Sequence, residues 1–219
     1  MLKIYGVLRS RATRNVWLAR EVGIPFERID VVQAYRLPAP DAPDAPLNTR
    51  SPAFLAINPH GHIPAIDDDG LRLGESFAIN LYLARKHGGP LAPRDLAEDA
   101  QMTMWSMWAM ADVEPHALSV MYNRVAKPEA ERDAAAAKAG VLALERPFAT
   151  LEAHLAASGG HLVGGRFTVA DLNVAEAFRY AQAAPELFRP APHVTAWLAA
   201  CQARPHFTQM MAERNAEPA

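Results

Sequence analysis

One short stretch, residues 58–66, constrains the fold of this chain more than any other; it reads Asn-Pro-His-Gly-His-Ile-Pro-Ala-Ile. Pro59 and Gly61 break any regular element, and Ile63-Pro64 then opens a short apolar run. A cis peptide bond before proline costs only about 0.5–1 kcal/mol, so we predict a cis bond between Ile63 and Pro64. That bend would leave the N–H and C=O groups of Ile63 without a strand partner, and they could then pair with the backbone of a small extended peptide.

The residues that follow complete a candidate pocket. The run 68–70, Asp-Asp-Gly, predicts a hairpin turn between two short strands, 65–66 and 71–73. Glu75-Ser76 then opens a segment with apolar residues at helical spacing. A serine at a helix start offers its hydroxyl and free N–H groups to a carboxylate. Peptide backbone on one side, with carboxylate and ammonium contacts on the other, predicts a site for a small zwitterionic peptide.

Composition narrows the class of function. The 219 residues suffice for one large or two small domains, and a formal net charge of -2 gives no basic excess, so we expect no nucleic-acid partner. No apolar run approaches the length of a membrane span, and a strand pattern begins at Leu2, which leaves no room for a signal peptide. Cys201 is the only cysteine, which excludes an internal disulfide and argues against a thiolate zinc site. We expect a cytoplasmic protein without metal or membrane contact.

Residues 1–88 predict an α/β domain. Leu2–Tyr5 alternates as a strand, a helix stopped by Gly23 follows, and residues 26–32 alternate again, which is typical of a βαβ unit with parallel strands. Residues 33–50 carry four prolines and predict an exposed loop, and residues 52–57 predict a short helix. The complete order, βαβαββα, is a thioredoxin-like arrangement with the last two strands antiparallel.

Residues 89–96 predict a linker, and residues 97–219 an all-α domain, a helical bundle. The helix over 97–124 is apolar on almost every face, which is typical of a buried helix, with a kink at Pro115. A second long helix is expected from Pro128 to about residue 158. Thr168 and Asp171 have the spacing of a capping box at the start of another helix. A pair of short helices ends the chain and carries Trp197, Leu198 and Phe207.

Two motifs, NPHGHIPAI and ESFAINLYL, resemble in order and spacing those of the cytosolic glutathione transferases, in particular the bacterial, serine-type members. The resemblance covers the whole chain. It implies a thioredoxin-like first domain that binds glutathione as co-substrate, a helical second domain that contributes the electrophile pocket, and a homodimer. Family members usually have a shorter connection than residues 34–49 here, so this loop resembles an insertion. We hypothesise that it covers the glutathione site.

The resemblance implies a serine donor to the glutathione thiolate at the turn between the first strand and the first helix, which is Ser10 here. A hydrogen bond and a nearby helix N-terminus both favour a thiolate. A helix cap is the alternative role for Ser10, and Tyr5 and Thr13 are rival donors. Many serine-type relatives have proline after the serine, whereas this chain has Arg11. No cysteine lies at the turn, which excludes a mixed-disulfide mechanism.

The remaining glutathione contacts are also implied by the resemblance. His62 stands where relatives carry Lys or Arg, so it would bond the glycine carboxylate; a solvated turn histidine is the alternative. Ile63 would act through its backbone and Pro64 through its geometry. Glu75 and Ser76 would hold the γ-glutamyl ammonium and carboxylate, respectively.

The pocket for the second substrate is predicted less directly. Relatives build it from the first turn and the start of the helical domain, which here makes candidates of Leu8, Trp105, Trp108, Asp112 and Tyr122. A Met and Trp stripe at helical spacing is more often core than pocket. Three arginines, Arg9, Arg11 and Arg14, could serve an anionic substrate but are more typical of a solvated helix start. Cys201 is expected to be a small buried residue of a late helix.

We therefore predict a glutathione S-transferase that activates the thiol of glutathione for attack on a small electrophile. A glutathione-dependent isomerase or peroxidase would use the same site. A non-catalytic relative that binds a protein partner or a hydrophobic ligand is the alternative from another class, because fold alone does not establish activity.

Overall fold

The structure is a computed structural model that describes residues 1–218. Its contacts divide the chain into two compact units: residues 1–89 together with residues 205–218, and residues 90–204. The sequence predicts domains at 1–88 and 97–219, so the two divisions differ most in where the last helix belongs.

The first unit is built on a four-stranded sheet in the order β2-β1-β3-β4. Its strands are β1 (Leu2–Tyr5), β2 (Phe26–Ile29), β3 (Ala65–Asp68) and β4 (Leu71–Gly74). β1 and β2 are parallel, whereas β1–β3 and β3–β4 are antiparallel. The turn Asp69-Gly70 has φ values of 52° and 96°, the backbone that a two-residue hairpin needs. The predicted thioredoxin-like order βαβαββα is confirmed.

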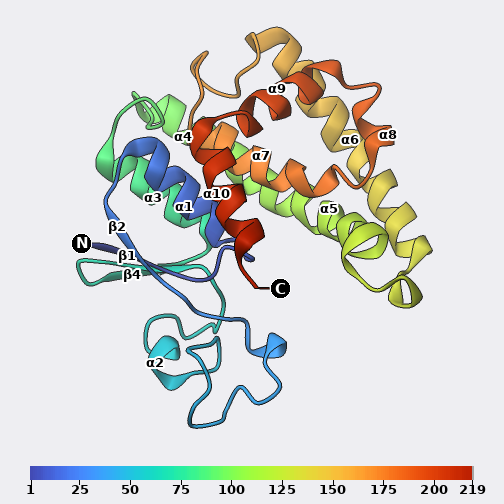
Figure 1. The fold of residues 1–219 in the computed structure, drawn as a ribbon. Coiled ribbons are helices and arrows are strands. Elements are labelled where there is room, and N and C mark those ends of the chain that lie inside the picture. The colour runs from blue at the N-terminus through green and yellow to red at the C-terminus, as the bar shows by residue number, and fades with distance from the viewer. Residues whose placement is uncertain (219) are drawn as a thin grey trace. The chain divides into compact units, whose positions relative to one another are not determined.

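Helices cover both faces of this sheet (Figure 1). On one face α1 (Ala12–Val22) packs against α3 (Ser76–His87), and α2 (Pro52–Leu55) lies on the other face. The 3-10 turn η1 (Ala34–Arg36) lies between β2 and α2 in the chain. α1 ends at Gly23 as predicted, because a φ of 76° provides the left-handed residue that closes a helix. Trp17 of α1 is fully buried, so this helix forms the centre of the unit.

The proline-rich loop before α2 is held by one buried side chain, Asn48. Its Nδ2 donates to the carbonyl oxygens of Pro40 and Pro46, both at 2.9 Å, and its Oδ1 accepts from the backbone N–H of Arg50 at 2.9 Å. Asn48 also forms an isolated parallel bridge with Val32. The loop therefore has a defined conformation outside helix and sheet. Its role as a cover for the peptide site stays a prediction.

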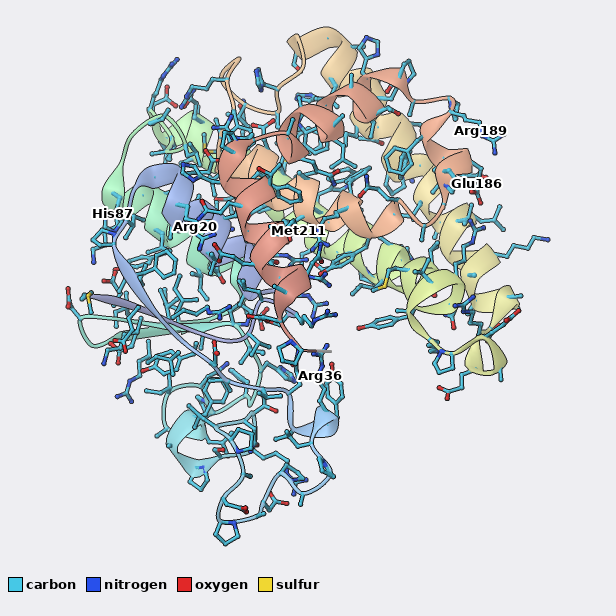
Figure 2. The ribbon with its side chains drawn as sticks, viewed as in Figure 1. Arg20, Arg36, His87, Glu186, Arg189 and Met211 are labelled. Atoms are coloured by element: carbon cyan, nitrogen blue, oxygen red, sulfur yellow. The ribbon has the colours of Figure 1, made fainter. Side chains whose placement is uncertain are left out.

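The helix α10 (Pro205–Ala216) belongs to the first unit although it is distant in sequence. Phe207 packs edge-on against Trp17, with ring centroids 4.9 Å apart, and Glu213 accepts from Arg20 at 2.8 Å. Figure 2 labels Arg20 on α1 and Met211 on α10, and shows the two helices side by side. The sequence groups α10 with the helical domain because nothing in its local pattern identifies Trp17 as its partner.

The second unit is entirely helical. Its elements are α4 (Leu96–Trp108), the π-helical η2 (Ala109–Val113), α5 (Glu114–Met121), the π-helical η3 (Tyr122–Ala126), the 3-10 turn η4 (Glu129–Glu131), α6 (Ala134–Ser158), α7 (Val169–Ala181), α8 (Pro185–Phe188) and α9 (Pro192–Gln202). α7 is the most buried helix and contacts α4, α5 and α9. Cys201 is buried in α9, as predicted. Among residues 1–218 no helix is both long and apolar enough to cross a membrane.

Two expectations for this unit are corrected. The helix predicted over 97–124 is divided by the π-helical η2, with Pro115 in the first turn of α5, and its last residues belong to the π-helical η3. Part of its apolar surface is exposed, including Met104 at 54%. The helix expected from Pro128 begins at Ala134, because the side chain of Asp133 accepts from the backbone N–H groups of the first turn and caps it there.

The predicted capping box at the start of α7 is confirmed. One carboxylate oxygen of Asp171 accepts from the backbone N–H and the hydroxyl of Thr168, at 2.9 and 3.0 Å. The other accepts from the backbone N–H of Leu162 at 3.1 Å and from Trp197 Nε1 at 3.0 Å. Asp171 is fully buried, so it joins the start of α7 to α9 and to the preceding loop.

An ion pair also joins the start of α4 to the loop before α7. Arg166 donates to both carboxylate oxygens of Glu98, at 2.9 and 2.7 Å, and to the carbonyl oxygens of Pro90 and Ala92. Both charged side chains are about 15% exposed. The guanidinium of Arg166 lowers the pKa of Glu98 to about 2.

This pair predicts a pH dependence of stability. Because the folded-state pKa of Glu98 lies below the ordinary value of 4.5, its contribution is complete above pH 4.5 and is lost as the pH falls toward 2. We expect Glu98→Gln to lower Tm at pH 7 and to flatten the fall of Tm between pH 4.5 and 2. Thermal denaturation followed by circular dichroism tests this. Glu186→Gln, which removes a more exposed pair with Arg124, is the control; equal flattening in both variants would contradict the prediction.

Candidate functional site

Ser10 lies in the turn that leads from β1 to α1, two residues before α1 begins. Its side chain is half-buried; its Oγ donates to the carbonyl oxygen of Val7 at 2.6 Å and accepts from the backbone N–H of Ala12 at 3.1 Å. Gly6 has a φ of 143° and no side chain, so Ser10 and Ile63 can both approach its backbone closely. A Cβ at Gly6 would lie 3.6 Å from Ser10 Oγ and 3.4 Å from the Cβ of Ile63. The fold therefore brings the Ser10 hydroxyl and Ile63 to the same place.

The two rival donors, Tyr5 and Thr13, are both buried. Tyr5 is 8% exposed and belongs to a core cluster with Val31 and Ala65, its ring 6.3 Å from that of Phe54. Thr13 is fully buried, and its hydroxyl donates to the carbonyl oxygen of Ser10 at 3.2 Å. Of these three hydroxyls, that of Ser10 belongs to the most exposed residue, which favours it as the group that meets a ligand.

The turn that holds Ile63 is built by Asn58. Its Nδ2 donates to the carbonyl oxygen of His62 at 2.7 Å, and its Oδ1 accepts from the backbone N–H of His60 at 3.2 Å. The Ile63–Pro64 bond is cis, as predicted. Pairing of β3 with β1 reaches only as far as Ala65, so Ile63 lies outside the sheet. The side chain of His62 is exposed beside it.

Glu75 and Ser76 follow β4 directly and differ sharply in exposure. Glu75 is exposed and has φ 62° and ψ 104°, a conformation that a residue with a Cβ rarely adopts. Such backbone strain persists where the surrounding structure enforces it and is enriched at functional sites. Ser76 is 5% exposed at the first residue of α3. An exposed carboxylate next to a buried hydroxyl suits a ligand that carries both an ammonium and a carboxylate.

Arg14 is the residue that sequence reasoning missed. The sequence assigns it to a solvated helix start, but its side chain is 2% exposed, and its Nη1 donates to Ser76 Oγ at 3.0 Å. Its guanidinium also lies 4.5 Å from the ring centroid of Phe77. Asn15 donates to the carbonyl oxygen of Ser76 at 2.9 Å and to Asn80 Oδ1 at 2.6 Å. This buried polar network joins α1 to α3 directly behind Ser76.

Because an arginine only donates hydrogen bonds, Ser76 Oγ accepts from Arg14 and keeps its own hydroxyl hydrogen for another acceptor. The arginine also sets a positive charge beside that hydroxyl. Both effects favour a carboxylate at Ser76. The polar run 9–15 contains three arginines, and only long-range packing distinguishes the buried Arg14 from the exposed Arg11.

The candidates for the second-substrate pocket differ in their surroundings. Trp105 is 7% exposed and packs edge-on against Trp108, with centroids 5.1 Å apart, and against His154 at 4.6 Å. Trp108 lies 6.1 Å from Phe178 of α7, so both tryptophans contribute to the aromatic core of the second unit. The other three candidates are the buried Leu8, in the first unit, and the exposed Asp112 and Tyr122.

A thioredoxin-like sheet with a cis-proline turn, combined with an all-helical unit, defines the architecture that the sequence motifs predict. Family models agree with it in both units: "Glutathione S-transferase, N-terminal domain" matches residues 10–86, and "Glutathione S-transferase, C-terminal domain" matches residues 110–205. A curated relative, "Glutathione S-transferase 3" of Zea mays, is 33% identical over 96% of this chain and 93% of its own length. The chain belongs to the glutathione S-transferase family.

Solved structures of relatives carry the same fold. The theta class glutathione S-transferase of Xanthomonas axonopodis pv. citri, with glutathione bound, is 31% identical, covers 95% of each chain and has a TM-score of 0.75. Glutathione S-transferase I bound with lactoylglutathione is 26% identical, covers 97% of this chain and 99% of its own, and has a TM-score of 0.82. Relatives from a plant and a bacterium both match, so the comparisons support the family as a whole rather than its bacterial, serine-type members. Among the described residues no cluster of three or more His, Cys, Asp or Glu is arranged to hold a metal ion.

Proposed function

We propose that this chain is a serine-type glutathione transferase that conjugates the thiol of glutathione to a small electrophile. One observation carries the proposal: the Ser10 hydroxyl and Ile63 meet at Gly6, so a peptide paired with the Ile63 backbone would bring its own side chain to Ser10. Relatives that are named glutathione S-transferases, one with glutathione bound and one with lactoylglutathione, support the choice of peptide.

The chemistry follows from the acidity of the thiol. A free cysteine thiol has a pKa of about 8.5, so little thiolate is present at neutral pH. A hydrogen bond from Ser10 and the N-terminus of α1 both stabilise the anion and lower that pKa. The hydroxyl hydrogen of Ser10, which points to Val7 here, rotates to the sulfur when glutathione is bound. The thiolate then forms a bond to the electrophilic carbon, and the electron pair of the broken bond leaves with the leaving group.

The remaining contacts hold the tripeptide. The N–H and C=O of Ile63, oriented by Pro64, pair with its backbone, and His62 bonds its glycine carboxylate. Glu75 binds the γ-glutamyl ammonium. Ser76, with Arg14 behind it, binds the γ-glutamyl carboxylate.

The candidates for contact with the electrophile are Leu8, Trp105, Trp108, Asp112 and Tyr122. We further propose a cytoplasmic homodimer. The exposed methionines of the second unit, Met104, Met107 and Met110, support a contact with a second copy, because exposed apolar residues gather where proteins associate.

Calorimetric binding of glutathione, with thiolate absorbance followed against pH, tests the assignment of Ser10. We expect Ser10→Ala to bind glutathione but to return its thiol pKa to about 8.5, with a loss of kcat of about 100-fold for a general model electrophile. Thr13→Val, which removes the neighbouring buried hydroxyl, is expected to keep the lowered pKa. A lowered pKa in Ser10→Ala would move the donor to Thr13 or Tyr5. Absence of glutathione binding in the wild type would favour a non-catalytic relative.

A further inference from the structure

The turn that carries Ser10 is hydrogen-bonded to Glu217 through Arg9. Glu217 follows α10 and is 208 residues away from Arg9 in sequence. Oε2 of Glu217 accepts from the backbone N–H of Arg9 at 3.0 Å, and its backbone carbonyl accepts from Arg9 Nε at 2.9 Å. Its other carboxylate oxygen accepts from Arg28 of β2. The side chain of Glu217 is 16% exposed, so this is a partly buried contact rather than a loose surface pair.

The opposite side of Arg9 is held as well. Its carbonyl oxygen accepts from Gln33 Nε2 at 3.3 Å and from Arg36 Nη2 at 3.4 Å. Arg36, labelled in Figure 2, lies on η1. The two peptide groups that flank the Cα of Arg9 are therefore both restrained, and the second of them contains the backbone nitrogen of Ser10. The direction of the Ser10 side chain depends on these restraints.

The charges around Glu217 explain why the contact is specific to this carboxylate. The guanidinium of Arg28 and the backbone N–H of Arg9 both donate to it, and Arg28 also pairs with Asp30 at 3.2 Å. Four residues earlier on α10, Glu213 pairs with Arg20 of α1. Glu213 therefore joins α10 to α1 by an ion pair. Of these two glutamates, Glu217 is the one that is hydrogen-bonded to the turn that carries Ser10.

We infer that Glu217 is a positioning residue for Ser10: by fixing the backbone of Arg9, it keeps the Ser10 hydroxyl aimed at the glutathione thiol. This inference rests on the proposed function and deepens it. Loss of the carboxylate frees the Arg9 N–H and lets the turn relax, so the hydroxyl hydrogen bond to the thiolate becomes longer and less populated. Glutathione contacts at Ile63 and Ser76 are left intact, so binding is retained while thiol activation is lost.

The experiment uses the whole chain and glutathione itself. It compares the wild type with Glu217→Ala, Glu217→Gln and Ser10→Ala, and takes Glu213→Ala, on the helix that precedes Glu217, as the matched control. Bound-thiol pKa, kcat, KM for glutathione and Tm are measured for each. We expect Glu217→Ala to raise the bound-thiol pKa toward that of Ser10→Ala and to lower kcat about 10-fold with KM nearly unchanged. Glu217→Gln, which keeps an oxygen for the Arg9 N–H, should recover most of the activity.

A wild-type thiol pKa in Glu217→Ala, with the pKa raised in Ser10→Ala, would overturn the inference and leave the proposed function standing. The same would follow if Glu213→Ala raised the thiol pKa as much as Glu217→Ala, because the effect would then come from α10 as a whole. A wild-type thiol pKa in Ser10→Ala would overturn the inference together with the assignment of Ser10, and would move the donor to Thr13 or Tyr5. Absence of glutathione binding in the wild type would overturn the proposed function itself.

Discussion

Asp171→Ala is expected to lower the free energy of unfolding of the second unit by at least about 3 kcal/mol, since a buried donor left without its acceptor costs about 1–3 kcal/mol. The carboxylate accepts from four donors on Leu162, Thr168 and Trp197. All four are lost together, and the side chain is fully buried, so water does not replace them readily. Urea denaturation followed by circular dichroism and tryptophan fluorescence measures the change.

The control for this prediction is another helix-capping aspartate. Asp133 caps α6 through two backbone N–H groups, each at 2.9 Å, but it is exposed. We expect Asp133→Ala to cost only about 1 kcal/mol, as capping residues usually do. Asp171→Asn, which keeps one oxygen acceptor, should fall between the two. If Asp171→Ala cost no more than Asp133→Ala, the buried network would contribute nothing beyond an ordinary cap.

Arg14→Met is expected to weaken glutathione binding by about 10- to 100-fold, because a hydrogen bond to a charged group contributes about 1.5–3 kcal/mol and each 1.4 kcal/mol is tenfold. The methionine fills much of the volume but gives Ser76 no donor and the carboxylate no positive charge. The effect should appear in Kd and in KM for glutathione, while the thiol pKa in the saturated complex stays near that of the wild type. Calorimetry and steady-state kinetics separate these quantities.

Arg11→Met is the matched control for Arg14→Met. Arg11 lies three residues earlier in the same polar run but is exposed. The Arg11→Met variant should bind glutathione as the wild type does. Arg14→Lys keeps the charge without the planar guanidinium that lies over Phe77, and it should bind less well than the wild type. Equal glutathione affinity in Arg14→Met and Arg11→Met would show that the buried arginine serves packing alone.

Local chemistry explains which predictions from the sequence are confirmed. Pro64 after Ile63, the turn at Asp69-Gly70, the helix stop at Gly23 and the capping box at Thr168 each depend on a few neighbouring residues. Such residues restrict their own backbone or bond within one turn, so the sequence records them directly. Errors concentrate where local signals compete: α6 begins at Ala134 rather than Pro128, because the cap that Asp133 provides prevails over the helix start that Pro128 indicates.

The sequence by itself determined the order of strands and helices in the first unit, the cis-proline turn and the motif residues of the candidate peptide site. Only the tertiary structure decided that Arg14 is buried behind Ser76, that α10 packs on α1 and that Glu217 reaches the Ser10 turn. These contacts join residues that are 62 to 208 positions apart. Their physical origin is the burial of apolar surface such as Trp17 against Phe207, which brings charged side chains together as a consequence and leaves no sign in the residues next to them.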